Sequence, residues 1–223
     1  MSAGEIVSEL KSAGGDKKFS EMTLGYSSYG SGDEILGVSV PAIRAIYKKY
    51  KPQIQMGDVE KLLYSEIHEA RFLALLAMID MFPADEGEIV RLYLRALDDG
   101  KVNNWDLVDL SSHKIIGRHC LENNDTVIMN ELAKANDLWK NRVAMVSCWH
   151  FVRNDRPEIV LDFARKLKNH PHHLIHKAMG WMLREAWKKT PASVEDFLAK
   201  NDLPKITVSY ATELQRKKHK QAS

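Results

Sequence analysis

The sequence predicts an all-α protein, an α-solenoid in which antiparallel helix pairs stack one on the next. Apolar residues recur at helical spacing along almost all of the 223 residues, and no stretch alternates convincingly as a strand would. The helical segments are joined by short polar links. Prolines fall between these segments, where a helix must end or begin, at positions 52, 83, 157, 171, 191 and 204.

The predicted helices follow the chain in order. Pro41 opens the first one, because proline suits the first turn of a helix. The segment HEARFLALLAMIDMF is apolar enough for a buried helix and ends before Pro83. The predicted ranges are 42–50, 68–82, 86–97, 104–116, 125–135, 138–152, 158–167, 174–187, 192–199 and a last helix from 205 into the tail.

Helix pairs of this length fit HEAT-like repeats, in which each pair buries its apolar face by stacking on its neighbours. Such a stack is curved and presents a concave groove wide enough for an extended ligand. No strict sequence repeat is present, so a compact irregular helical bundle stays an alternative. No domain boundary is evident, and the glycine-rich stretch 28–37 is interpreted as an internal loop, so we expect one domain over residues 1–223.

The composition is that of a soluble globular protein, with 44% hydrophobic and 28% charged residues. No apolar run approaches the ~20 residues that a membrane span needs. The first 15 residues carry no apolar signal core, and the two cysteines, Cys120 and Cys148, are too few for a disulfide framework. We therefore expect a cytoplasmic, monomeric protein with buried free thiols.

The net charge is only +2, but the charges are unevenly distributed. Acidic residues gather between positions 80 and 99, and basic residues gather at 48–51, 165–177 and 184–189. This asymmetry permits a face that binds a polyanion such as DNA, and a solvated basic surface is the alternative.

Asp109 is the first candidate for chemistry. Trp105 precedes it by four residues and so lies on the same helical face. A carboxylate beside an electron-rich ring suits a positive charge that develops during a reaction. Asn103 is expected to cap this helix, with Asp106 in its first turn near the positive end of the dipole. Asp109 has no such structural role, and an exposed helix carboxylate is the alternative.

Arg142 interrupts an apolar row made by Leu138, Met145 and Trp149. A guanidinium at such a position should be paired or should bind an anion, because an unpaired buried charge is costly. It is interpreted as a partner for Asp109 or as a bidentate phosphate clamp, and an arginine that snorkels at the core rim is the alternative.

Trp181 lies off the core stripe of its helix, which is Ile175, Met179, Met182 and Ala186. It lies nearer Lys177 and Arg184, and the three together resemble a nucleic-acid contact surface. A tryptophan that fills the edge of a helix–helix contact is the alternative.

No metal or cofactor is expected. His172 and His176 have the i,i+4 spacing of a metal pair, but no glutamate or cysteine completes a known ligand pattern. Walker, Rossmann and GxSxG motifs are absent from the sequence.

The segments GVSVPAIRAIYKKY, WDLVD, KNRVAM and IHKAMGWMLREAWKKTP together resemble the AlkD-type DNA alkylation repair glycosylases, a family built of HEAT-like repeats. The resemblance implies that Asp109 is the catalytic aspartate, that Trp105 and Trp181 are cleft tryptophans and that Arg142 is the cleft arginine. It also implies that Arg184 lies near the DNA backbone.

The implied reaction is hydrolysis of the N-glycosidic bond of cationic N3- or N7-alkylated purines, such as 3-methyladenine and 7-methylguanine, in duplex DNA during base excision repair. Such a base leaves neutral, so no general acid, metal or cofactor is needed. The alternatives are a non-catalytic DNA-binding protein of the same fold and a protein-interaction solenoid. Because double-stranded DNA is the expected partner, the protein would act at the nucleoid.

Overall fold

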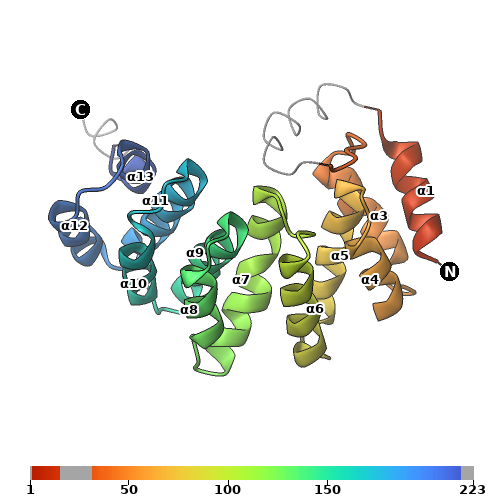
Figure 1. The fold of residues 1–223 in the computed structure, drawn as a ribbon, viewed down its shortest axis with the longest axis horizontal. Helices are drawn as coiled ribbons and strands as arrows, with labels where there is room; N and C mark the ends of the chain where they lie inside the picture. Colours follow the sequence, from red (N-terminus) through yellow and green to blue (C-terminus); the bar gives the residue numbers. More distant parts are fainter. Residues whose placement is uncertain (1, 16–31, 217–223) are drawn as a thin grey trace. The chain divides into compact units, whose positions relative to one another are not determined.

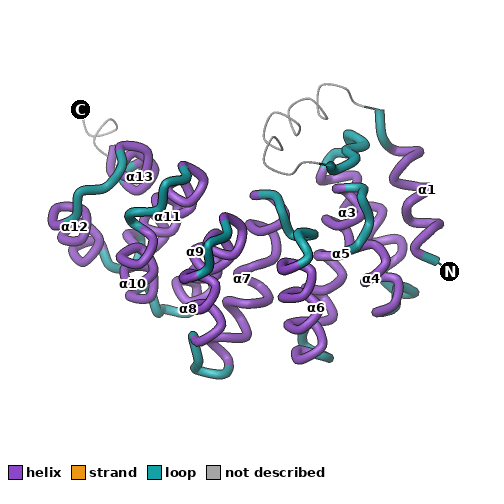
Figure 2. The backbone as a smooth tube through the Cα atoms, viewed as in Figure 1, coloured by secondary structure: helices purple, strands orange, loops and turns teal. Residues whose placement is uncertain are grey.

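The computed structural model describes residues 2–15 and 32–216 (Figure 1). The regular secondary structure of these residues is helical (Figure 2). The β-type pairing within them is an isolated bridge between Glu34 and Ile67. Within the described ranges no helix is long and apolar enough to cross a membrane. The predicted all-α class and α-solenoid fold are confirmed.

The chain divides into two compact units, Met1–Ser111 and Ser112–Ser223. The division falls inside α7 (Trp105–Glu122). The first unit contains α1 (Ala3–Ala13), α3 (Val40–Tyr50), α4 (Met56–Leu63), α5 (His68–Met81), α6 (Glu86–Asp98) and the start of α7. The second contains the rest of α7, then α8 (Val127–Lys134), α9 (Leu138–Arg153), α10 (Glu158–Leu167), α11 (His173–Trp187), α12 (Pro191–Lys200) and α13 (Lys205–Ala211). One domain over residues 1–223 stays a prediction.

The core of the first unit forms around α5, which packs against α1, α3, α4 and α6. This helix is buried from His68 to Met78, as expected for a helix that is apolar on every side. Its first turn departs from that pattern, because His68, Glu69 and Arg71 are buried there beside the apolar residues.

The second unit forms around α9 and α11. Helix α9 packs against α8, α10 and α11, and α11 also packs against α12 and α13. The predicted core stripe of α11 is buried. A side chain at Gly180 would place its Cβ 2.6 Å from the carbonyl oxygen of Thr207, so the absence of a side chain permits the close approach of α11 and α13.

The predicted helix bounds lie close to the observed ones for most helices. Helix α7 is longer than expected, since it continues to Glu122 rather than ending at residue 116. Helices α1 and α4 are not predicted by the sequence analysis. They support each other, because the backbone amide of Ala3 donates to Asp58 Oδ1 at 3.1 Å. Of the predicted loop 28–37, residues 28–31 lie outside the described residues, and residues 32–37 contain no helix.

Candidate active site

The start of α7 carries the two first-unit candidates, Trp105 and Asp109, and both side chains are partly exposed. Asn104 precedes the helix, and its Oδ1 accepts a hydrogen bond from the backbone amide of Trp105 at 2.7 Å. The expected Asn103 cap is wrong. Its amide nitrogen instead donates to Asp33 Oδ1 at 3.4 Å, and its Oδ1 is buried without a hydrogen-bond partner among the described residues.

Asp109 lies near the buried Tyr93 of α6. Burial raises the pKa of the Tyr93 phenol, and the negative charge of Asp109 raises it further. The Ser111 hydroxyl donates to the carbonyl oxygen of Leu107 at 2.6 Å, so Tyr93 donates to Ser111 Oγ at 3.1 Å. Asp109 is therefore a partly exposed carboxylate in the neighbourhood of a neutral, hydrogen-bonded phenol.

Asp106 lies at the positive end of the helix dipole, as predicted, and its carboxylate also contacts His68. Its Oδ2 lies 2.8 Å from Nε2 of the buried His68, while its Oδ1 accepts from the backbone amide of Leu107 at 2.8 Å. On the other side of the ring, His68 Nδ1 lies 3.9 Å from Asp33 Oδ2, which is an ion-pair distance and too long for a hydrogen bond. Asp33 forms a second ion pair with Arg71.

Glu69 ties the loop before α3 to the same helix. Its carboxylate accepts hydrogen bonds from the backbone amides of Leu36, Gly37 and Val38, at 3.1, 2.8 and 3.2 Å. His68, Glu69 and Arg71 are not predicted as a group from the sequence. The sequence does contain a feature that indicates this group, because residues 68–71 (HEAR) place three ionisable side chains at the start of an otherwise apolar helix.

Arg142 is buried in the second unit, with 5% of its surface exposed. Its Nη1 donates to the carbonyl oxygen of Leu174, in the first turn of α11, at 2.6 Å. The guanidinium is therefore buried against a backbone carbonyl rather than snorkelling, and its roles as a partner for Asp109 or as a phosphate clamp stay predictions. The contact fixes α9 against the start of α11.

Trp181 belongs to an aromatic cluster of the second unit. Its ring centroid lies 5.0 Å from that of Trp149 in an edge-to-face arrangement, and Trp149 lies 4.5 Å from His113. The Arg153 guanidinium lies 5.9 Å from the Trp149 ring centre. Burial lowers the pKa of His113 to about 3, so the ring is neutral. Trp149, which the sequence places in an apolar row, is partly exposed and supports Trp181.

The predicted DNA-contacting residues of α11 differ in their surroundings. Arg184 forms ion pairs with Glu213 and, at 3.5 Å, with Glu185. Lys177 is partly exposed and forms no ion pair with any residue in the described ranges. Lys177 is therefore the better placed of the two to meet a phosphate, whereas Arg184 has to exchange a carboxylate for one.

The basic run at 48–51 is partly neutralised within the first unit. Lys49 lies 2.6 Å from Glu9, and Lys51 lies 2.7 Å from Asp80. The alternative of a solvated basic surface describes this run better than a polyanion-binding face does.

The histidines at the start of α11 bind backbone atoms. His170 Nδ1 accepts from the amide of His172, His172 Nδ1 accepts from the amide of Leu174, and His176 Nε2 donates to the carbonyl oxygen of His170, at 3.0, 3.1 and 2.6 Å. Across residues 2–15 and 32–216, no group of three or more histidine, cysteine or acidic side chains could hold a metal ion. Both cysteines are free and buried, as expected, and burial raises the pKa of the Cys120 thiol to about 11.

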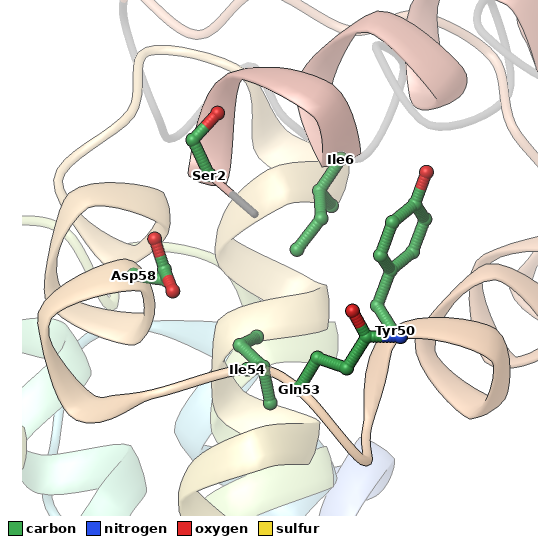
Figure 3. A pocket seen from close by; sticks show the side chains of 6 residues that line it. All are labelled: Ser2, Ile6, Tyr50, Gln53, Ile54 and Asp58. Atoms are coloured by element: carbon green, nitrogen blue, oxygen red, sulfur yellow. The ribbon is translucent and has the colours of Figure 1, made fainter.

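A narrow pocket of the first unit is lined by none of the candidate residues (Figure 3). It has no room for a water molecule, and its lining is Ser2, Ile6, Tyr50, Gln53, Ile54 and Asp58.

The fold and the candidate residues define an all-α helical-repeat protein with a carboxylate and an indole on one helix. The chain belongs to the family of DNA alkylation repair enzymes, whose pattern it matches over residues 6–214. The resemblance stated from the sequence is thus confirmed, and the family gives the protein a role in the repair of alkylated DNA.

The chain is also similar to a solved structure described as a "Predicted DNA alkylation repair enzyme from Enterococcus faecalis". The two share 17% sequence identity with a TM-score of 0.73, over 89% of this chain and 95% of the other, and this likeness shows the fold. No curated protein matches the sequence.

Proposed function

We propose that this family member is a DNA glycosylase that hydrolyses the N-glycosidic bond of cationic N3- and N7-alkylated purines in duplex DNA. The observation that carries the proposal is the Trp105–Asp109 pair on one face of α7. An alkylated purine already carries a positive charge, so it departs as a neutral base without a general acid. The deoxyribose then develops oxocarbenium character, which a carboxylate stabilises.

Each candidate residue has a role in this proposal. Asp109 stabilises the oxocarbenium ion and orients or deprotonates the attacking water. Trp105 and Trp181 attract the cation with their ring faces. Arg142 belongs to the same catalytic group, and its buried contact with α11 gives it a fixed position. Lys177 and Arg184 would contact the DNA backbone, and Arg142 would reach it only with the small part of its surface that is exposed.

The proposed setting follows from the substrate. An enzyme that excises bases from DNA needs no metal, cofactor or second subunit for this reaction. We propose that the protein acts as a monomer in the cytoplasm, bound to nucleoid DNA, in the first step of base excision repair.

The test is release of free 7-methylguanine from methylated duplex DNA by the wild type and by Asp109→Asn. The variant keeps the shape of the side chain and removes its charge, so we expect release to fall by about 10²–10³-fold with DNA affinity nearly unchanged. Asp98→Asn, the same change at an exposed position on α6, is the control and should release the base normally. An Asp109→Asn variant as active as the wild type would refute the assigned role.

The second candidate function is a DNA-binding protein without excision activity. The partly exposed Lys177 supports this function, because a cation without an ion pair in the described ranges can meet a phosphate whether or not a base is excised. Salt-dependent DNA binding without release of either 7-methylguanine or a bulkier cationic adduct would establish this function.

A further inference from the structure

We propose that His68 is a positioning residue that holds the start of α7, and with it Asp109 and Trp105, through an ion pair with Asp106. The inference rests on the proposed function for its catalytic consequence. The contact itself belongs to the first unit and stands independently of that function.

Three elements meet at His68. It is the first residue of α5, Asp106 lies in the first turn of α7, and Asp33 lies in the loop before α3. The imidazole has one nitrogen 2.8 Å from Asp106 and the other 3.9 Å from Asp33. Only 3% of the surface of His68 is exposed. The ring therefore lies between two carboxylates from segments that are far apart in the chain.

Backbone contacts hold the same junction. The amide of Glu34 donates to the carbonyl oxygen of Glu66 at 2.9 Å, and the amide of His68 donates to the carbonyl oxygen of Glu34 at 2.9 Å. These hydrogen bonds attach the loop to the start of α5. Further along the loop, the Glu69 carboxylate accepts hydrogen bonds from the amides of residues 36–38. A shift of the His68 ring would therefore require the loop to move as well.

The charges around His68 balance when the ring is protonated. Asp33 and Asp106 are matched by a protonated His68 and by Arg71, whereas a neutral imidazole leaves these two carboxylates with a single cation. The neighbouring buried carboxylate of Glu69 is compensated by the three backbone amides that it accepts from. Burial alone would lower the pKa of His68, but the two carboxylates outweigh burial and the repulsion of Arg71 and raise it to about 9. At the edge of this group, Lys101 is paired with Glu66 at 2.8 Å.

The first turn of a helix is the part most prone to fraying, because its amides lack intrahelical partners. Asp106 lies next to Trp105 and one turn before Asp109. An anchor on Asp106 therefore restrains both candidate side chains. Misplacement of a catalytic group by about 1 Å can slow a reaction by about 10²-fold.

The first test measures excision under single-turnover conditions with saturating enzyme, from pH 6.5 to 9.5, with a blank without enzyme subtracted at each pH. His68→Gln removes the titrating group. We expect it to excise about tenfold to a hundredfold more slowly, to bind DNA as tightly as the wild type, and to lack the fall in rate that the wild type shows as the pH rises through about 9. His119→Gln, in the last turn of α7, is the matched control and should behave as the wild type does.

The second test does not depend on excision. Hydrogen exchange is measured at the amide of Val108, which donates to the carbonyl oxygen of Asn104 at 3.1 Å. We expect faster exchange in His68→Gln than in the wild type or His119→Gln. Asp106→Asn, which removes the charge at a more exposed position, should give the same result and serves if His68→Gln does not fold.

Each outcome decides between the two proposals. Unchanged exchange in both variants overturns the anchor, and so does a slower His68→Gln that keeps the fall in rate at alkaline pH. If the wild type releases no base while exchange increases in the variants, the glycosylase proposal fails and the anchor on α7 stands.

Discussion

The pH dependence of stability is the sharpest consequence of the buried charges around His68. The folded protein holds the proton of His68 with a pKa of about 9, against 6.5 for an ordinary imidazole. Because the folded value is the higher one, the stabilisation is complete below the unfolded pKa and is lost as the pH rises through the folded pKa. At ~1.4 kcal/mol for each pH unit, the whole effect is ~3 kcal/mol.

Few other groups with a perturbed pKa titrate in this range. Burial lowers the pKa of His113 to about 3 and also lowers those of His150, His170 and His172, so these rings bind protons mainly in the unfolded state and their smaller contributions have the opposite sign. Burial raises the pKa of the Cys120 thiol to about 11, so its contribution is lost only at higher pH. Between about pH 6.5 and 8.5, His68 therefore dominates the expected change, which is a loss of ~2 kcal/mol.

Urea unfolding followed by circular dichroism measures this loss. The free energy of unfolding of the wild type should fall over the window relative to that of His68→Gln. The difference between the two slopes cancels the contributions of the groups that both proteins share. Parallel slopes for the two proteins would show that His68 is not protonated between its carboxylates.

Three further changes follow from the second unit and are measured independently. Gly180→Ala places a Cβ 2.6 Å from a carbonyl oxygen of α13 and should lower the free energy of unfolding, measured in urea, by about 1–3 kcal/mol. Gly57→Ala is the control, because no neighbouring atom lies within 4 Å of its Cβ, and it should not lower this free energy. Equal effects of the two substitutions would contradict the close packing of α11 on α13. Glu213→Gln removes the charged partner of Arg184, so it should raise the affinity for DNA and steepen the salt dependence of binding by about one counterion. Unchanged binding would show that Arg184 does not contact the DNA. Trp149→Ala removes the edge-to-face partner of Trp181, a contact worth about 1 kcal/mol. It should slow base release more than it weakens DNA binding. A proportional loss of base release and of DNA binding would indicate that Trp149 contacts the DNA instead.

The helices that the sequence predicts are those with a long apolar stripe and a clear stop. The range 158–167 is observed as predicted, and 138–152 is extended by a single residue. Helix α4 was missed because it has only 8 residues and follows a polar segment, so its stability comes from neighbours such as α1 rather than from its own pattern. Helix α7 runs past the predicted end at 116 because Gly117, which would weaken an isolated helix, lies in close contact with α9.

The candidate site likewise contains features that the sequence predicts and features that only the fold shows. Trp105 and Asp109 could be paired from the sequence, since four residues on a helix define one face. The need of Arg142 for a partner could also be foreseen, since a charge in an apolar row has to be compensated. The identity of that partner could not, because the carbonyl oxygen of Leu174 lies 32 residues away in the chain.

The group around His68 shows what can be inferred when ionisable residues stand in an apolar segment of the sequence. Burying ionisable side chains is costly, and a well-packed apolar core of similar volume is often as stable or more so. A run of His68, Glu69 and Arg71 in an otherwise apolar helix therefore indicates that the chain needs directional contacts at that place. The sequence shows the conflict, but Asp33 and Asp106 lie 35 and 38 residues away on either side, so only the fold shows what the contacts hold. Because one of them ends on the helix turn that precedes Asp109, the buried charges are best explained by the position of α7 rather than by stability alone.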